Sequence, residues 1–224
     1  MNRANDESRV GTAPREAFVM SNLQPVPREQ LAEFEEFFSL VEASMGFVPN
    51  SLPTMGHRPE ILRAFAALSG AVLGPGSVDP RLKQLIALMA STSNGCRYCQ
   101  AHTAATAARR GVSLEKLEAV YEFETSDWFA EAERSALRLA RDAALVPNCT
   151  TPQHFEDLRK YFDDGEIVEI VAVVSLFGWL NRWNDTMGTE LEEEPLLFAS
   201  KHLGNHGWVP GKHADGPFGM NIRS

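Results

Sequence analysis

The chain has no excess of basic residues and no long apolar run, and each shortage excludes a class of protein. Its 224 residues include 21 Lys and Arg against 30 Asp and Glu, so the formal net charge is -9. Because nucleic-acid-binding surfaces gather Lys and Arg, we expect no nucleic-acid partner. No apolar run reaches the roughly 20 residues that a membrane-spanning helix needs, so we also expect no membrane insertion.

Two other signals are missing. Residues 1–24 are polar, with mixed charge, and lack the apolar core of a signal peptide, so we expect a flexible N-terminal arm and a cytoplasmic protein. The alternation of apolar and polar residues that marks β-hairpins is also absent. The run 167–176 has a strand-like composition, but its length favours a helix. Apolar residues elsewhere recur at helical spacing, and we predict an all-α fold.

Helix boundaries are indicated by proline, glycine and small polar residues. Pro59 suits the first position of a helix, and Asp79 followed by Pro80 is a typical helix start. Gly95 marks a break after the strongly apolar stretch that follows Pro80. We expect helices over residues 27–45, 49–55, 59–72, 80–94, 96–110, 113–121, 127–144, 151–162 and 167–180.

Residues 25–198 are expected to form one domain, since a chain of this length buries a sizeable core. The acidic run 192–194 is interpreted as a solvated turn. Residues 199–224, rich in Gly, His and Pro, are expected to form an extended tail. The tail histidines are spaced irregularly, which favours a tail lying on the body or on a neighbouring subunit over a metal site; they are His202, His206 and His213.

A weak internal repeat appears when the chain is shifted by about 85 residues, which lays residues 79–99 over residues 164–184. Each copy has an acidic cap, an apolar helix and a polar tetrad, Cys-Arg-Tyr-Cys in one and Asn-Arg-Trp-Asn in the other. The repeat predicts two related helical hairpins, although chance similarity between helices gives the same pattern. Glu169, which aligns with Gln84, is expected in a salt bridge with an arginine.

Cysteine is scarce, and two of the three cysteines lie close together in the segment 94–102. In a helix that starts here, Cys96, Cys99 and His102 occupy neighbouring positions on one face. The partial positive charge of a helix N-terminus favours thiolate, so the segment predicts a reactive dithiol with a proton-handling neighbour. Cys149 stands alone and is expected to be a bystander.

Other interpretations of the segment remain open. The two cysteines could be small core residues, although a C-x-x-C pair in a reducing compartment is more often catalytic or metal-binding. A zinc site on Cys96, Cys99 and His102 would have three ligands, whereas zinc takes four or keeps a water. We expect neither a bound metal nor a cofactor.

Several motifs, in order along the chain, resemble the carboxymuconolactone decarboxylase superfamily, and in particular its AhpD-like, peroxidase-related branch. The resemblance covers about residues 25–195 and is centred on C-x-x-C. The motifs that carry it are at residues 45–50, 58–62, 94–102, 131–139, 163–168 and 177–185.

The resemblance implies an AhpD-like helical bundle that forms homo-oligomers, often trimers or multiples of them. It implies that Cys99 attacks a hydroperoxide and that Cys96 resolves the sulfenic acid as a disulfide. A separate dithiol reductant, a small molecule or a protein, must then restore the two thiols by exchange.

The chain departs from the family pattern around the cysteines. Gln84 stands where a relay glutamate is expected, Tyr98 stands where a histidine is expected, and His102 follows Cys99 by three residues instead of four. Gln84 could orient Tyr98, His102 or a water, or could simply be a buried polar residue. Tyr98 could be an aromatic wall or could lend its hydroxyl to the site. The departures imply weaker peroxidase activity or a different relay.

The leading hypothesis is a thiol-dependent alkyl hydroperoxide reductase. Its predicted catalytic residues are Cys99, Cys96, His102, Gln84 and Tyr98. One alternative is a cofactor-free decarboxylase or isomerase that uses acid–base residues. Another is a redox-sensing or partner-binding helical oligomer without efficient turnover, which the missing relay glutamate favours.

Overall fold

The computed structural model describes residues 21–214, and within this range the chain is all-α, as predicted. Ten α-helices and four short 3-10 helices make up the described part, with no strand. The α-helices are α1 (Glu35–Met45), α2 (Ser51–Met55), α3 (Pro59–Leu73), α4 (Pro80–Asn94), α5 (Arg97–Arg109), α6 (Leu114–Glu118), α7 (Glu131–Ala143), α8 (Pro152–Leu158), α9 (Asp164–Met187) and α10 (Glu193–His202).

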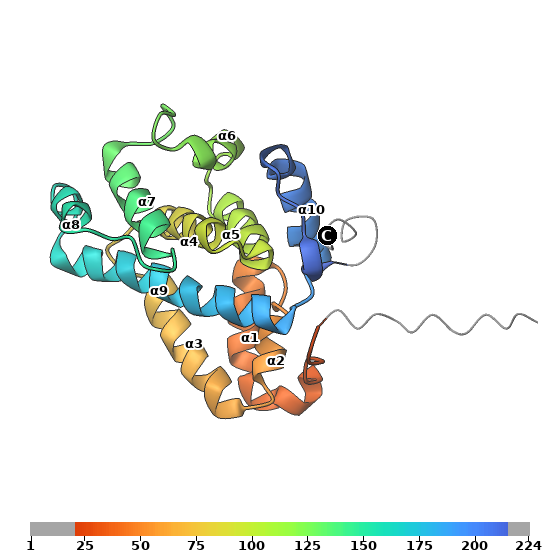
Figure 1. Ribbon diagram of the computed structural model, residues 1–224. Helices are drawn as coiled ribbons and strands as arrows, with labels where there is room; N and C mark the ends of the chain where they lie inside the picture. Colours follow the sequence, from red (N-terminus) through yellow and green to blue (C-terminus); the bar gives the residue numbers. More distant parts are fainter. Residues whose placement is uncertain (1–20, 215–224) are drawn as a thin grey trace, which may run out of the picture.

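Helix α4 lies at the centre of the bundle, packed against α5, α7 and α9 (Figure 1). Every residue from Leu82 to Ser91 is buried, which is typical of a helix surrounded by neighbours on all sides. The Asp79 carboxylate accepts a hydrogen bond from the Arg81 N–H at 2.7 Å, and Gly95 ends the helix with φ of 76°. The predicted start and break of α4 are therefore confirmed.

Helix α9 runs across the molecule, with α1, α2 and α3 on one side and α4, α5 and α7 on the other (Figure 1). Asp163 and Glu166 form a capping box at its start. It continues to Met187, well beyond the predicted end at residue 180. The second copy of the weak repeat is thus one continuous helix and has no break, because Leu180 stands where the first copy has Gly95.

A second core lies beneath α9, between the N-terminal helices. Its buried residues are Leu31, Phe34, Phe38, Leu52, Met55 and Leu62. Leu180 and Trp183 of α9 pack against this cluster, so one helix joins both cores. No helix within residues 21–214 is long and apolar enough to cross a membrane.

Two boundaries differ from the sequence prediction. Helix α7 begins at Glu131 and not at Asp127, since the Glu133 carboxylate accepts the Ala130 N–H at 3.0 Å. Residues 199–214, expected to be extended, instead complete α10 and form two 3-10 turns. Trp208 holds this segment on the body, because its buried ring donates Nε1–H to the Arg97 carbonyl at 3.3 Å. The rest of the predicted arm and tail, residues 1–20 and 215–224, lies outside the described residues.

A buried lysine ties α4 to α9. Lys83 is only 1% exposed, and its Nζ lies 2.8 Å from a carboxylate oxygen of Glu169. The ammonium also donates to the carbonyls of Val72 and Gly74, at 3.0 and 3.2 Å, where α3 ends. Glu169 therefore forms a salt bridge, but with a lysine and not with the expected arginine.

We expect Glu169→Ala to lower the free energy of unfolding by about 3 kcal/mol, because it leaves a buried ammonium without its counter-charge. Urea unfolding at neutral pH measures the loss. Glu33→Ala is the matched control, since it breaks an exposed pair with Arg63 and should cost much less. Equal losses in the two variants would contradict the role assigned to the Lys83–Glu169 pair.

Candidate functional site

The C-x-x-C pair lies at the N-terminus of α5, buried in the main core. Cys96 is the N-cap of the helix and not a residue of its first turn, and Cys99 lies inside the helix. The two thiols are free, and the side chains are 1% and 3% exposed. Cys149 is exposed in the loop between α7 and α8, as expected of a bystander.

An amide from α9 contacts the second cysteine. Asn184 Nδ2 lies 3.4 Å from Cys99 Sγ, while Asn184 Oδ1 accepts a hydrogen bond from the Thr189 hydroxyl at 2.9 Å. A hydroxyl bonded to Oδ1 fixes the amide so that its N–H groups face the sulfur. This donor stabilises negative charge on Cys99, and the sequence reasoning did not identify it.

The thiol of Cys99 nevertheless holds its proton firmly. Burial raises the pKa of Cys99 well above its usual range, and the adjacent sulfur of Cys96 raises it further. The Asn184 amide acts in the opposite direction but does not outweigh burial. A base must therefore remove this proton before Cys99 can act as a nucleophile.

Glu192 is the site residue that the sequence analysis placed in a solvated turn. Its Oε2 lies 2.6 Å from His102 Nε2, and its Oε1 accepts hydrogen bonds from the Tyr98 hydroxyl at 2.9 Å and the Asn50 N–H at 2.6 Å. Glu192 is 90 residues away from His102 in the chain, so no local spacing connects them. Its position immediately before α10 was the available signal, but an acidic residue there is common on exposed helix starts.

The Glu192 carboxylate stays ionised in this setting. Burial alone would raise the pKa of Glu192, but the nearby His102 and the Asn50 N–H together lower it below its ordinary value. Tyr98 remains a phenol, because burial and the Glu192 charge raise its pKa well above the usual range. The Tyr98 and His102 rings stack at 4.2 Å, and Phe47 meets His102 edge-on at 5.4 Å.

Gln84 is buried in α4, with 3% of its surface exposed. In residues 21–214 no hydrogen bond joins its side chain to Tyr98 or His102, so direct orientation of these two side chains by Gln84 is not seen. Those two side chains are held by Glu192 instead. A carboxylate thus lies beside Tyr98 and His102, and it comes from the segment before α10 and not from position 84.

His213 brings a second histidine to the cysteines. Its Nδ1 lies 2.7 Å from the Thr189 carbonyl, and its Nε2 lies 3.2 Å from Asp185 Oδ1. The ring is buried and lies 5.8 Å from the Tyr98 ring. Of the two placements expected for the tail histidines, on the body or on another subunit, the structure shows the first for His213.

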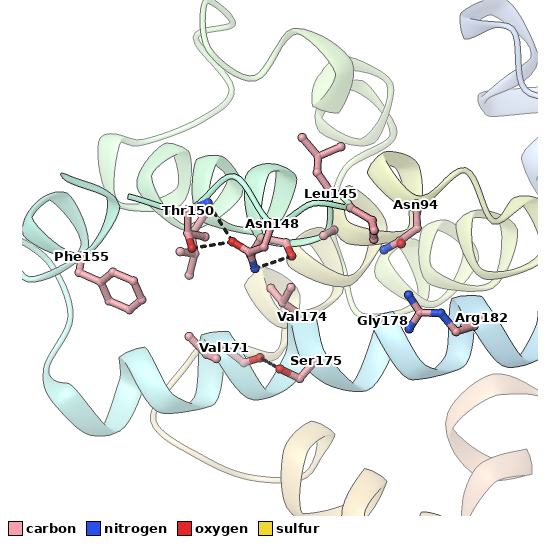
Figure 2. Close-up of a pocket in the computed structure, with 14 residues that line it drawn as sticks. Asn94, Leu145, Asn148, Thr150, Phe155, Val171, Val174, Ser175, Gly178 and Arg182 are labelled. Carbon is pink, nitrogen blue, oxygen red and sulfur yellow. Dashed lines mark hydrogen bonds between the residues drawn. The ribbon is translucent and has the colours of Figure 1, made fainter. Parts of the chain in front are cut away.

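Two adjoining cavities lie along α9 and share Asn94 and Arg182. The first, about 370 Å³, is largely apolar; Figure 2 shows α9 side chains such as Val174 facing the loop residues Leu145 and Asn148 across it. The second is about 320 Å³ and its lining residues are polar; they are Asn94, Asn181, Arg182, Asp185, Thr186 and Lys212. The polar cavity approaches the dithiol, because a carboxylate oxygen of Asp185 lies within 4.8 Å of Cys96 Sγ.

Comparison with known proteins finds relatives that span the body of the chain. The family model of the carboxymuconolactone decarboxylase family matches residues 59–142. The debrominase Bmp8 is similar in structure, with a TM-score of 0.77 and 33% identity for its unliganded form over 80% of this chain and 97% of the debrominase. A cysteine-to-alanine variant of that debrominase, crystallised with 2,3,4-tribromopyrrole, gives the same TM-score at 32% identity.

Two further relatives are uncharacterised proteins. A peroxidase-related protein with an AhpD core from Ralstonia eutropha JMP134 has a TM-score of 0.71 and 26% identity over 81% of this chain and 97% of its own. The protein YdfG of Bacillus subtilis is 23% identical over 113 residues, which are 50% of this chain and 77% of YdfG.

We expect Glu192→Gln to lower the free energy of unfolding by about 2 kcal/mol at pH 7, because it weakens hydrogen bonds to a charged acceptor. The folded pKa of Glu192 is lower than the unfolded one, so its contribution is complete above the unfolded value of about 4.3 and is lost as the pH falls through the folded pKa. Urea unfolding of both proteins at pH 7 and at a pH below about 4 should show a smaller difference in unfolding free energy between parent and variant at the lower pH. A difference in unfolding free energy that stays constant or grows at the lower pH would contradict the stabilising role of the ionised Glu192.

Proposed function

This chain belongs to the carboxymuconolactone decarboxylase superfamily, in its AhpD-like branch, and on that premise we propose that it is a thiol-dependent hydroperoxide reductase. The observation that carries the proposal is the buried Cys96–Cys99 pair, with the Asn184 amide at the Cys99 sulfur and with His102, the partner of Glu192, three residues after Cys99 on the same helix. An enzyme, the debrominase, is among the similar proteins, which supports a catalytic role.

His102 is the proposed base. Its Nε2 faces the Glu192 carboxylate, which only accepts hydrogen bonds, so Nε2 carries the hydrogen and Nδ1 holds the lone pair. Within the described residues Nδ1 has no hydrogen-bond partner. His102 lies one helical turn after Cys99, and Nδ1 is therefore assigned to take the Cys99 proton while Glu192 stabilises the imidazolium that forms.

The reaction proceeds in two steps. The Cys99 thiolate attacks the terminal oxygen of ROOH, the O–O bond breaks, the alkoxide takes a proton and leaves as ROH, and Cys99 becomes a sulfenic acid. The Cys96 sulfur then attacks the sulfenic sulfur, the S–O bond breaks, and water leaves with the Cys96 proton. Two thiols and ROOH have become a disulfide, ROH and water, and an external dithiol restores the thiols by exchange.

Glu192 makes this proposal stronger than the sequence alone did. The departures at positions 84 and 98 implied an incomplete relay. The Glu192–His102 pair, with Tyr98 bonded to the same carboxylate, supplies an acid–base group from the segment before α10. These contacts support the interpretation that the chain has a different proton relay and does not lack one.

A homo-oligomer is part of the proposal. Several large apolar side chains on α3 and α9 are at least one-third exposed in the single chain; they are Ile61, Leu68, Val168, Val171 and Trp179. Burial of these side chains against a second copy would remove apolar surface from water. The dithiol reductant is proposed by chemical class only.

We expect Cys99→Ser to abolish the reduction of cumene hydroperoxide with dithiothreitol as reductant, because the attacking sulfur is gone. Cys149→Ser, which removes an exposed cysteine outside the site, should keep full activity. Cys96→Ser should retain one oxidation to sulfenic acid, trapped by dimedone and detected by mass spectrometry. Normal turnover in Cys99→Ser would exclude the assignment.

Reductive dehalogenation is a second candidate, favoured by the 32–33% identity to a debrominase over 97% of its length. The same dithiol suits this chemistry. A thiolate takes the bromine of an aryl bromide, the carbon takes a proton, and the second thiol displaces bromide to leave a disulfide. One aryl bromide and two thiols thus become an arene, HBr and a disulfide.

If this second candidate is correct, the reduced protein releases one bromide from 2,3,4-tribromopyrrole for each disulfide formed, and dithiothreitol makes the release catalytic. Ion chromatography measures bromide, and a parallel assay with cumene hydroperoxide measures the competing activity. A higher kcat/KM for the hydroperoxide, without bromide release above the Cys99→Ser background, would leave the peroxidase as the function.

A further inference from the structure

We propose that Cys96, Asp185 and His213 form a binding site for a divalent transition metal of the zinc type. One ligand atom from each residue lies within 4.8 Å of the other two. They come from three parts of the fold, namely the N-cap of α5, the last turns of α9 and the 3-10 turn Gly211–His213. Cys96 and His213 are each 1% exposed, so these two ligands are shielded from water.

The hydrogen bonds of His213 direct a lone pair into this group. The Thr189 carbonyl lies 2.7 Å from Nδ1 and can only accept, so Nδ1 carries a hydrogen. A metal-binding histidine is held in this way, with one ring nitrogen bonded to a carbonyl and the other free to ligate. Nε2 faces Asp185 Oδ1 at 3.2 Å, and the carboxylate is also an acceptor. These two candidate ligand atoms therefore already lie side by side in the group.

The chemistry of the three ligands fits zinc. Thiolate, imidazole and carboxylate are its usual protein ligands, and three of them leave one position for water. The charges balance, because a divalent ion meets one thiolate, one carboxylate and a neutral imidazole. Zinc bonds of about 2.0–2.3 Å bring ligand atoms to within about 4 Å of one another. Side-chain shifts of about 1 Å therefore bring the three ligand atoms to zinc-binding distances.

The polar cavity provides access and a partner for the open position. The Asp185 side chain is 41% exposed and lines this cavity. Lys212 Nζ lies 3.4 Å from Asp185 Oδ2, so Oδ1 remains available as a metal ligand. Asn181 lines the same cavity, is 2% exposed, and neither atom of its amide has a hydrogen-bond partner within the described residues. That buried amide is a suitable partner for a metal-bound water.

This site differs from the zinc site on Cys96, Cys99 and His102 that the sequence pattern suggested. His102 is held by Glu192, and the histidine next to Cys96 is His213. A metal on the Cys96 sulfur and a disulfide to Cys99 are mutually exclusive states of that sulfur. Bound metal would therefore hold the dithiol reduced and inactive.

Cobalt(II) tests the site, because thiolate ligation gives a sulfur-to-cobalt charge-transfer band. The full chain is used in the reduced form, in a Cys149→Ser background that removes the exposed thiol. We expect one Co²⁺ per chain with this band, and Zn²⁺ should displace it. Cys96→Ser should lose the band, and His213→Gln and Asp185→Asn should each weaken Co²⁺ binding at least tenfold, as the loss of a ligand requires.

His206→Gln is the matched control, since His206 is exposed against Tyr121 and outside the group. It should bind Co²⁺ as tightly as the parent. Absence of the charge-transfer band, or unchanged Co²⁺ affinity in both His213→Gln and Asp185→Asn, would overturn the proposal and leave an ordinary hydrogen bond between His213 and Asp185. The assay contains no peroxide, so its outcome is independent of whether the protein reduces one.

Discussion

The arrangement of the site depends on the carboxylate of Glu192, which is shared by three groups from two other parts of the chain. His102 and Tyr98 come from α5 and Asn50 from the start of α2, and all three meet the two oxygens of one side chain. Burial opposes the charge of Glu192, and only the surrounding partners keep it ionised. Removing one partner therefore affects the others, because a buried carboxylate with fewer hydrogen bonds is costly.

The same segment that supplies Glu192 also closes the site. Helix α10 packs against α5, and the 3-10 turns after it bring Trp208 onto the Arg97 carbonyl and His213 beside Cys96. The segment thus adds two polar groups near the start of α5, Glu192 beside His102 and His213 beside Cys96. Burial of both sulfurs makes their chemistry depend on these groups and not on water, since the thiolate is poorly solvated there.

Local signals predicted the fold well because they act within a few residues. Asp79, Pro80 and Gly95 bound α4 through backbone capping, and the C-x-x-C spacing placed both sulfurs at one helix start. Local signals could not predict the contacts of Glu192 and His213. Their partners are 90 and 28 residues away in the chain, and a Gly- and His-rich composition suggested an extended tail. Leu203 and Trp208 of that segment are buried, and their packing helps to hold it on the body.

The distance in sequence between the cysteines and their carboxylate has a consequence for biosynthesis. Glu192 follows His102 by 90 residues, so at 5–20 residues per second the ribosome adds it roughly 5 to 18 s after the dithiol. During that interval the helix that carries the two thiols lacks both the Glu192 carboxylate and the α10 segment that packs against it. The nascent chain therefore carries the C-x-x-C pair uncovered until the last helices dock.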